Sequence, residues 1–379
     1  MKIALVSPYD YSYPGGVCRH ISSLEYYFTR MGHLVKIIAP ASSPVTGYGD
    51  RFIAIGKPRA IPASGSIARI TISLNLTDKV KEVLEREKFD VVHLHEPLAP
   101  TLCPTVLRLS KTVNIGTFHA NESKPSYRWA KPFMMSRLYK KWFNRLDGRI
   151  AVSRPAMEYV NKHYPCSYDI IPNGIELDHF RPDLEPLPEF MDGKINLLFV
   201  GRMEKRKGLE YLLKAYRLIK PDCPDCRLII VGPGTHSREK YEKMVAESEL
   251  KDVVFAGNVD YKILPRYYRT ADVFCAPATG HESFGIILLE AMATGTPLVA
   301  SRISGYASVM THEKEGLLVP PKQEVPLAQA IARLIKDPSL RHRLGQQGIQ
   351  TSSIYGWESV SRRVMDYYTR TILSKNIKL

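Results

Sequence analysis

The sequence predicts an α/β protein with two Rossmann-like, doubly wound domains, and three observations support this. Short apolar runs alternate with amphipathic stretches along most of the chain. The length of 379 residues is about twice the usual domain size of roughly 100–200 residues. A Pro-rich stretch, Pro182–Pro188, separates two series of such runs and has the composition of a linker. We therefore expect domains at residues 1–180 and 181–356, followed by a C-terminal segment, 357–379.

The first half opens with a strand–loop–helix–strand pattern, which is typical of a parallel sheet. An apolar run, Ile3–Val6, leads into a polar loop that contains Gly15 and Gly16. An amphipathic helix is expected at Val17–Met31 and the second strand at Leu34–Ala39. Later apolar runs in this half predict the strands Val91–Leu94, Val113–Phe118 and Gly148–Val152.

The second half repeats this scheme. Its predicted helices include Leu209–Ile219 and Phe284–Ala293, and a last helix is expected over Trp357–Leu373. Its predicted strands are Ile195–Val200, Arg227–Val231, Val253–Ala256, Val273–Ala276 and Pro297–Ala300. Folds of this kind bind ligands at the carboxyl ends of their strands, so we expect a cleft for ligands between the two halves.

The formal net charge of +15 favours anionic partners: nucleic acid, an anionic membrane surface or phosphorylated small molecules. The six cysteines are scattered, and the single CxxC pair, Cys223 and Cys226, has no second pair of metal ligands. Free turn cysteines are therefore the simpler interpretation. The first residues read as a buried strand and not as an export signal, and no run of 18 apolar residues occurs. We expect a cytoplasmic protein or one attached to the inner membrane face.

The segment GHESFGIILLEA, residues 280–291, places Glu282 and Glu290 eight residues apart. A helix that begins near Phe284 would put Glu282 at its N-terminus and Glu290 about two turns inside. Free N–H groups at such a terminus suit a diphosphate, and Glu290 could reach the hydroxyls of a ribose. The alternative is an N-cap followed by an ordinary surface glutamate.

The segment LLFVGRMEKRKGLEYLL, residues 197–213, places a cluster of cations directly after a buried strand. Arg202 and Lys207 could neutralise a pyrophosphate leaving group there. The alternative is a solvated basic turn. The chain contains no Asp-x-Asp pair, so these cations could replace a divalent metal ion. In the first half of the chain, the pair His93 and His95 at a strand end has no evident third ligand and is more simply structural.

Together VGRMEKRKG, HESFGIILLEAMATGTPLVAS and IPNGIELDHF resemble glycosyltransferase family 4, the retaining transferases with the GT-B fold, over nearly the whole chain. SPYDYSYPGGVCRHI, IPASGSIARI, HLHEPLAP and FHANESK are most similar to the bacterial phosphatidylinositol mannosyltransferases. The resemblance implies transfer of a hexose, mannose first, from a nucleotide diphosphate sugar to a lipid-linked polyol. It also implies that the last helix packs back on the first domain.

The resemblance implies roles for individual residues on the donor side. Glu282 matches the first acid of the EX7E motif, near the transferred sugar, and Glu290 matches the second, on the ribose. Arg202 and Lys207 match the pair that holds the diphosphate. The remaining matches are residues that approach the diphosphate, sugar or base: Gly16, Val259, Phe284, Gly285 and Ile286.

On the acceptor side, His119 matches a histidine near the reacting centre. The positions that face the inositol phosphate match Tyr9, Ser66, Arg69, Lys124 and Arg206. Two departures also lie here: Leu98 replaces an asparagine, and Ala120 opens Ala120-Asn121 where the mannosyltransferases have Thr-Ser. A changed polar contact alters specificity for a polyol, so the resemblance supports the donor chemistry better than the inositol acceptor.

Residues 124–149 carry eight basic residues and one acid, together with Trp129 and Trp142. Basic and aromatic residues on a helix favour contact with an anionic membrane surface. The alternative is a basic helix whose aromatic side chains pack inward.

We therefore expect a retaining glycosyltransferase, peripheral on the inner membrane face, with GDP-mannose as donor, no tightly bound cofactor and no essential metal. Open alternatives are another donor or acceptor, such as a UDP-sugar, a non-inositol lipid or a soluble sugar. A sugar-nucleotide epimerase of the same fold is a further alternative. A nucleic-acid-binding protein would explain the charge but neither motif.

Overall fold

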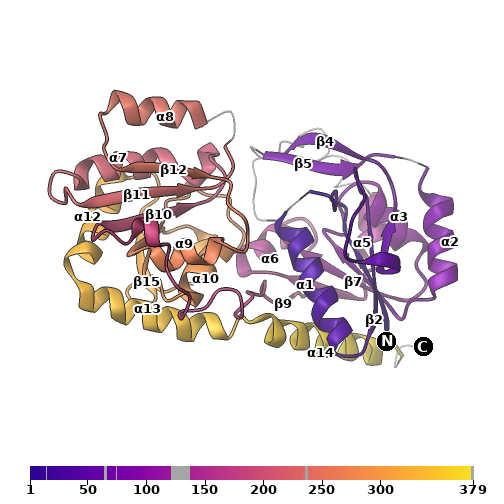
Figure 1. Ribbon diagram of the computed structural model, residues 1–379. Coiled ribbons are helices and arrows are strands. Elements are labelled where there is room, and N and C mark those ends of the chain that lie inside the picture. The colour runs from indigo at the N-terminus through magenta and orange to yellow at the C-terminus, as the bar shows by residue number, and fades with distance from the viewer. Residues whose placement is uncertain (14, 64–65, 74, 121–136, 235–237, 377–379) are drawn as a thin grey trace. The chain divides into compact units, whose positions relative to one another are not determined.

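The computed structural model describes residues 1–13, 15–63, 66–73, 75–120, 137–234 and 238–376. The chain forms two compact units. Unit 1 comprises Met1–Gly174 together with Trp357–Leu379, and unit 2 is the continuous stretch Ile175–Gly356. Each unit is built on a parallel sheet (Figure 1). The prediction of a doubly wound α/β protein is thereby confirmed.

The sheet of unit 1 has seven strands in the order β3-β2-β1-β6-β7-β8-β9. The strands are β1 (Lys2–Val6), β2 (Leu34–Ala39), β3 (Phe52–Ala54), β6 (Val91–His95), β7 (Val113–Phe118), β8 (Gly148–Ala151) and β9 (Asp169–Ile170). Strand order reverses beside β1, which pairs in parallel with both β2 and β6. At such a reversal the loops that follow the two flanking strands diverge, and a ligand can enter between them.

Helices and a short hairpin complete unit 1. The helices are α1 (Gly16–Arg30), α2 (Thr77–Glu87), α3 (Leu102–Leu109), α5 (Arg137–Phe143), α6 (Arg154–Asn161) and α14 (Trp357–Asn376), with a 3-10 turn at Gly49–Arg51. An antiparallel hairpin, β4 (Pro58–Ala63) and β5 (Ser66–Thr71), pairs with neither parallel sheet (Figure 1). The sequence analysis did not predict this hairpin.

Both faces of the unit 1 sheet are covered by apolar side chains. On one face α2, α3 and α5 contribute to the core, and on the other face α1 and α14 do so. Helix α14 packs directly on α1, and its Trp357, Val360 and Tyr368 are buried there. The last helix therefore belongs to unit 1, although the whole of unit 2 precedes it in the chain.

The sheet of unit 2 has six parallel strands in the order β12-β11-β10-β13-β14-β15. The strands are β10 (Ile195–Val200), β11 (Cys226–Val231), β12 (Val253–Gly257), β13 (Val273–Ala276), β14 (Leu298–Ser301) and β15 (Gly316–Val319). The reversal of strand order lies between β10 and β13. The loops after these two strands carry both sequence motifs, so the topology brings the motifs together.

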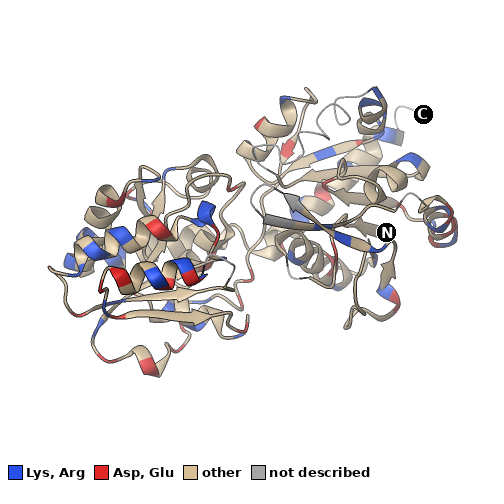
Figure 2. Ribbon diagram, turned by 90° about the horizontal axis from the view of Figure 1, so that it is seen from above, with Lys and Arg blue, Asp and Glu red and all other residues tan. Residues whose placement is uncertain are grey.

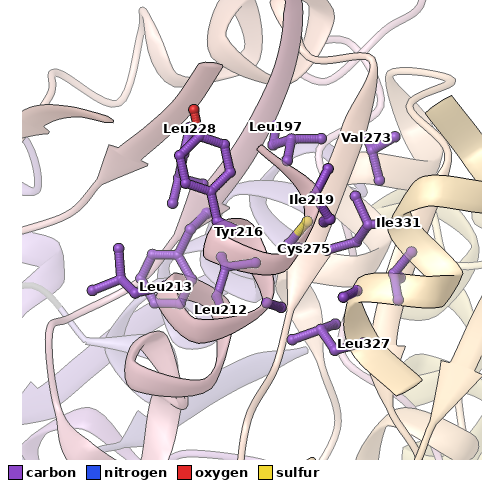
Figure 3. Packing of buried hydrophobic residues seen from close by; sticks show 14 of the residues in the cluster. Leu197, Leu212, Leu213, Tyr216, Ile219, Leu228, Val273, Cys275, Leu327 and Ile331 are labelled. Carbon is purple, nitrogen blue, oxygen red and sulfur yellow. The ribbon is translucent and has the colours of Figure 1, made fainter. Parts of the chain in front are cut away.

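The helices of unit 2 cover both faces of this sheet. They are α7 (Leu209–Ile219), α8 (Arg238–Glu247), α9 (Leu264–Thr270), α10 (Ile286–Ala293), α11 (Ser304–Ala307), α12 (Glu324–Lys336) and α13 (Pro338–Ser353), with 3-10 turns at Pro188–Phe190 and Lys205–Lys207. Figure 3 shows one core layer, where Leu212 and Tyr216 of α7 pack with Leu327 and Ile331 of α12 against Leu197. This packing fixes α7, and α7 holds the end of the basic loop that precedes it.

Helix α8 contributes little to the core. Tyr241 is its one buried residue, and acidic and basic residues alternate along the helix (Figure 2). Ion pairs four residues apart join Arg238 to Glu242 and Lys243 to Glu247. Exposed pairs of this kind contribute only about 0.3–0.5 kcal/mol each, so α8 is a solvated face and not a candidate site.

The Pro-rich stretch Pro182–Pro188 is part of unit 2 and does not join the units. Arg266 and Arg269 of α9 donate to the carbonyls of Glu185, Pro186 and Leu184. These contacts hold the stretch against α9, because guanidinium groups satisfy carbonyls that no strand pairs. The division between the units falls after Gly174, and the expected cleft between them stays a prediction.

None of the helices in the described part of the chain combines the length and the apolar character that crossing a bilayer requires.

Candidate functional site

A network of ion pairs joins the two motif loops of unit 2. Nζ of Lys207 lies 2.7 Å from Oε1 of Glu282, and Nη1 of Arg206 lies 2.6 Å from the same oxygen. Lys207 ends the 3-10 turn after β10, whereas Glu282 lies in the loop between β13 and α10. The structure therefore brings together residues that the sequence separates by 75 positions.

Glu282 is an anion at neutral pH in this environment. Burial raises the pKa of its carboxyl, but Lys207 and Arg206 lower it by more, so that the pKa lies below its usual range. A carboxylate with a low pKa accepts hydrogen bonds and does not act as a general acid. The geometry thus suits recognition of a hydroxyl group or stabilisation of developing positive charge.

A second acid, Glu204, was not predicted and organises the cations. Its Oε1 lies 2.9 Å from Nη1 of Arg202, and its Oε2 lies 3.0 Å from Nε of Arg206. The side chain of Glu204 is only 10% exposed, whereas that of Arg202 is 45% exposed. The network thus contains three cations and two carboxylates, and the remaining positive charge suits an anionic ligand.

Helix α10 begins at Ile286, two residues later than predicted, because Gly285 is its N-cap. The backbone of Gly285 has a φ of +112°, a value that residues with a side chain rarely adopt. A Cβ atom at this position would also lie 2.8 Å from Cδ1 of Tyr306. Gly285 has no side chain to cap the helix, so the N–H groups of the first turn are suited to an anion.

Glu290 lies in the second turn of α10 and is 4% exposed. Its Oε2 accepts a hydrogen bond of 2.7 Å from the hydroxyl of Tyr268, which is completely buried. Burial and the neighbouring carboxylate raise the pKa of Tyr268, so this hydroxyl stays a donor. The contact fixes the orientation of the Glu290 carboxyl. Contact of this carboxyl with a ribose stays a prediction.

The other donor-side residues lie in the same unit. The side chain of Phe284 is buried in the core and packs edge-on against Tyr355, so only its backbone is available to a ligand. Ile286 and Val259 are partly buried beside the same apolar cluster. Their roles in binding a sugar nucleotide stay predictions.

In unit 1, Gly16 is the first residue of α1. A Cβ atom there would meet no heavy atom of the described residues within 4 Å, and the φ of Gly16 is not positive. Neither backbone conformation nor packing within the described structure therefore explains a glycine at this position. Close approach of a ligand would explain it.

The β4–β5 hairpin brings two predicted acceptor residues together. Tyr9 forms an isolated antiparallel bridge with Ile70, and the backbone N–H of Asp10 donates to the carbonyl of Arg69 over 2.8 Å. The guanidinium of Arg69 lies 3.7 Å from the centre of the Tyr13 ring. Ser66 begins β5, but its side chain lies outside the described part of the structure, as does the whole of Lys124.

His119 follows β7 and is positioned by Glu96, which follows β6. Oε1 of Glu96 accepts hydrogen bonds of 2.7 Å from the backbone N–H groups of His119 and Ala120. Burial raises the pKa of Glu96 to about 7, and these two bonds lower it by less. The other departure, Leu98, is buried in the core, so its change alters packing directly.

Four histidines of unit 1 lie together, and the sequence analysis identified only part of this cluster. His93 and His95 lie on one side of β6, as alternation predicts, with ring centres 4.3 Å apart. His95 contacts His119, and His20 of α1 packs against both. His20 was not identified from the sequence, because it lies 75 residues before His95 in another element.

Only the last part of the basic aromatic segment 124–149 is described. Within α5, Tyr139 and Phe143 are buried and Trp142 packs against the same core, while Arg137, Lys140 and Lys141 are exposed. This part of the segment agrees with the alternative of inward-packed aromatic side chains. Residues 121–136 lie outside the described structure.

Two family models match the chain: "Glycosyltransferase Family 4" over residues 14–179 and "Glycosyl transferases group 1" over residues 183–351. A "Phosphatidyl-myo-inositol mannosyltransferase" from Mycobacterium leprae is 34% identical over 97% of this chain and 96% of its own length. The chain belongs to glycosyltransferase family 4. A protein of the same description from Mycolicibacterium smegmatis is 33% identical to this glycosyltransferase over 100% of the chain and 96% of its own length.

Solved structures confirm the GT-B fold of this family 4 glycosyltransferase. Sucrose-phosphate synthase from Thermosynechococcus elongatus is similar with a TM-score of 0.79 and 23% identity, over 98% of this chain and 99% of that one. The Anabaena protein HepE in complex with UDP is similar with a TM-score of 0.79 and 16% identity, over 98% of this chain and 100% of that one. At these identities the likeness concerns the fold alone.

Proposed function

We propose that this glycosyltransferase moves a hexose, mannose first, from a nucleotide diphosphate sugar to an inositol-containing phospholipid with retention of configuration. The observation that carries the donor half is the ion-pair network of Arg202, Lys207 and Glu282 beside the N-terminus of α10. The acceptor half rests on the descriptions of the mycobacterial relatives and on the positions of Tyr9, Arg69 and His119.

Departure of a nucleoside diphosphate leaves negative charge on the phosphates in the transition state. Lys207 is 13% exposed, so its charge is poorly screened by water and interacts strongly with a phosphate. Arg202 extends the positive surface, and the N–H groups of the first turn of α10 add further donors. These cations supply the stabilisation that a divalent metal ion gives in other transferases.

Retention is supported by the states of the two acids. Glu282 is held by Lys207 and Arg206, and Glu290 by Tyr268, so neither acid is placed as an unengaged nucleophile. We therefore favour attack by the acceptor hydroxyl on the face that the diphosphate leaves. The leaving phosphate accepts the proton of that hydroxyl, and the Glu282 carboxylate receives a hydrogen bond from the sugar.

The proposal is tested with pure protein, radiolabelled GDP-mannose or UDP-glucose, and liposomes with phosphatidylinositol, without added metal ion. We expect label from GDP-mannose in the lipid phase and digestion of that product by an α-mannosidase. Label from UDP-glucose alone would overturn the mannose donor. Tight nucleotide binding without any labelled lipid would overturn the inositol acceptor. Conversion of the donor sugar into another sugar when no acceptor is present would indicate an epimerase.

The same proposal places the enzyme on an anionic membrane surface, as its lipid acceptor requires. The exposed cations Arg137, Lys140 and Lys141 of α5 support this, since basic residues are attracted to such surfaces. Liposomes with anionic lipid should sediment the protein at low salt and release it at high salt. Replacement of all three residues by glutamine should reduce binding, and an unchanged bound fraction would remove α5 from the contact.

A further inference from the structure

We propose that His20, His95 and His119 of unit 1 form a binding site for a single zinc-like divalent transition metal ion. One ligand nitrogen from each histidine lies within 4.8 Å of those of the other two. His20 comes from α1, His95 ends β6 and His119 follows β7. Three imidazoles from three separate elements resemble the ligand set of zinc sites that keep a fourth position open.

The spacing of two of the nitrogens is close to what a metal ion requires. Nδ1 of His95 and Nε2 of His119 are 3.0 Å apart. Two nitrogens bound to one tetrahedral zinc ion at about 2.05 Å are separated by about 3.3 Å. The ion would therefore replace a shared proton with little movement of either ring.

His20 is oriented to present its remaining nitrogen. Its Nδ1 lies 2.9 Å from Oδ1 of Asn173, an acceptor, so Nδ1 carries the proton and Nε2 carries a lone pair. Ligating histidines generally donate their other N–H to an oxygen in this way. The ring also packs edge-on against Trp357, which restricts its rotation.

His95 shows that the cluster is incomplete by hydrogen bonding alone. It is completely buried, and its Nε2 has no hydrogen-bond partner among the described residues. By contrast, both nitrogens of the adjacent His93 are engaged, by the hydroxyls of Tyr368 and Thr117 at 2.6 Å. An unpaired buried nitrogen is costly, so His95 is less well satisfied than His93. The nitrogen that would bind the ion is the other one, Nδ1, which faces His119.

The protonation state agrees with this geometry. Burial lowers the pKa of His20 to about 4 and lowers the pKa values of His95 and His119 well below their usual range. All three rings are therefore neutral at pH 7, as metal ligands must be. A zinc ion bound at this site would also engage His119, so zinc should inhibit the proposed sugar transfer. Only this consequence rests on the proposed function.

The test uses the full chain after removal of metal with a chelator. Cobalt(II) reports its ligands by visible absorption, and calorimetry with zinc(II) gives affinity and stoichiometry. We expect one ion per chain and a nitrogen-ligand spectrum. His20→Ala should abolish the site, and Asn173→Ala should weaken it by about 10-fold to 100-fold. The matched control, His163→Ala, replaces an exposed histidine of the same unit and should bind as the unaltered chain does.

Three results would overturn the site. These are the absence of cobalt binding, an affinity unchanged by both substitutions, and a thiolate charge-transfer band, which would place the ion at Cys223 and Cys226. Circular dichroism checks that each variant folds. If His20→Ala does not fold, the metal affinity of Asn173→Ala decides whether the site exists. Because the readout is binding, failure of the site and failure of the transferase proposal are separate outcomes.

Discussion

Lys207 differs from Lys205 of the same basic loop by what it contacts. Lys205 lies in the same turn and is exposed, whereas Lys207 is mostly buried and paired with Glu282. From the sequence alone, the cations of this loop are equivalent. The contact with Glu282, which Lys207 shares with Arg206, places both cations beside the loop that precedes α10; Arg206 is also paired with Glu204.

Replacement of Lys207 by alanine should lower kcat by about 100-fold to 1,000-fold, because a buried charge that stabilises the leaving group is lost. Steady-state rates with GDP-mannose and phosphatidylinositol measure this effect. Lys205→Ala is the matched control and should retain near-normal turnover. Near-normal turnover in Lys207→Ala would contradict the assignment.

Gly16 offers the complementary experiment. Since a Cβ atom there meets nothing within 4 Å in the described structure, Gly16→Val should leave the fold intact. If a ligand phosphate approaches this backbone closely, the variant should bind GDP-mannose at least about 10-fold more weakly, which costs about 1.4 kcal/mol. Calorimetry measures the affinity, and unchanged binding would show that Gly16 contacts no donor.

At the scale of elements, α10 depends on the conformation of its N-cap. Gly285→Ala should destabilise the protein by about 1–3 kcal/mol, because the positive φ is unfavourable for alanine and the new Cβ meets Tyr306. Gly280 also has a positive φ but would meet nothing within 4 Å in the described structure, so Gly280→Ala isolates the backbone effect. Chemical denaturation measures both variants, and equal losses would rule out a contribution from Tyr306.

Sequence reasoning located the central strands well, because buried parallel strands are continuous apolar runs. The observed bounds of β1, β6 and β11 differ from the predicted ones by a single residue. The β4–β5 hairpin was missed because Pro58 and Pro62 interrupt the apolar pattern of its first strand. A proline in a strand normally argues against that assignment.

The candidate site was predictable where a motif lies within one loop. Arg202, Lys207 and Glu282 were identified from position after a strand or before a helix. Tyr268 was not, because its contact with Glu290 forms only when α9 and α10 meet. Glu204 was missed although its partners Arg202 and Arg206 lie in the same loop, because the sequence does not show which charges of a mixed run pair with one another. The histidine cluster was identified only in part, because α1, β6 and β7 are neighbours in the fold but distant in sequence.

At the scale of the molecule, the buried histidines make unit 1 sensitive to acid. The folded pKa is about 4 for His20 and about 3 for His93, and it is well below the usual range for His95 and His119. Below pH 6.5 the unfolded chain binds protons that the folded chain does not. The free energy of unfolding therefore decreases as the pH is lowered. Each group contributes about 1.4 kcal/mol per pH unit until its folded pKa is reached.

Glu96 acts in the opposite direction. Its pKa is raised from 4.5 to about 7 in the folded state, so its contribution to stability grows as pH falls through that window. One carboxyl opposes four histidines, and unit 1 should therefore be less stable at pH 5.5 than at pH 7.5. The three tryptophans, Trp129, Trp142 and Trp357, all belong to unit 1, so tryptophan fluorescence in urea follows this unit. Equal stability at both values would contradict the prediction.

Helix α14 gives the molecule an order of assembly. The chain leaves unit 1 after Gly174 and returns at Trp357, so unit 2 is a continuous insertion. On the ribosome, unit 2 can fold as soon as it has emerged, whereas unit 1 must wait until α14 is made, because until then α1 covers its face of the sheet without the side chains of α14. His93 gains its contact with Tyr368 only then. Premature termination within α14 would therefore release chains with an intact unit 2 and an unfinished histidine cluster in unit 1.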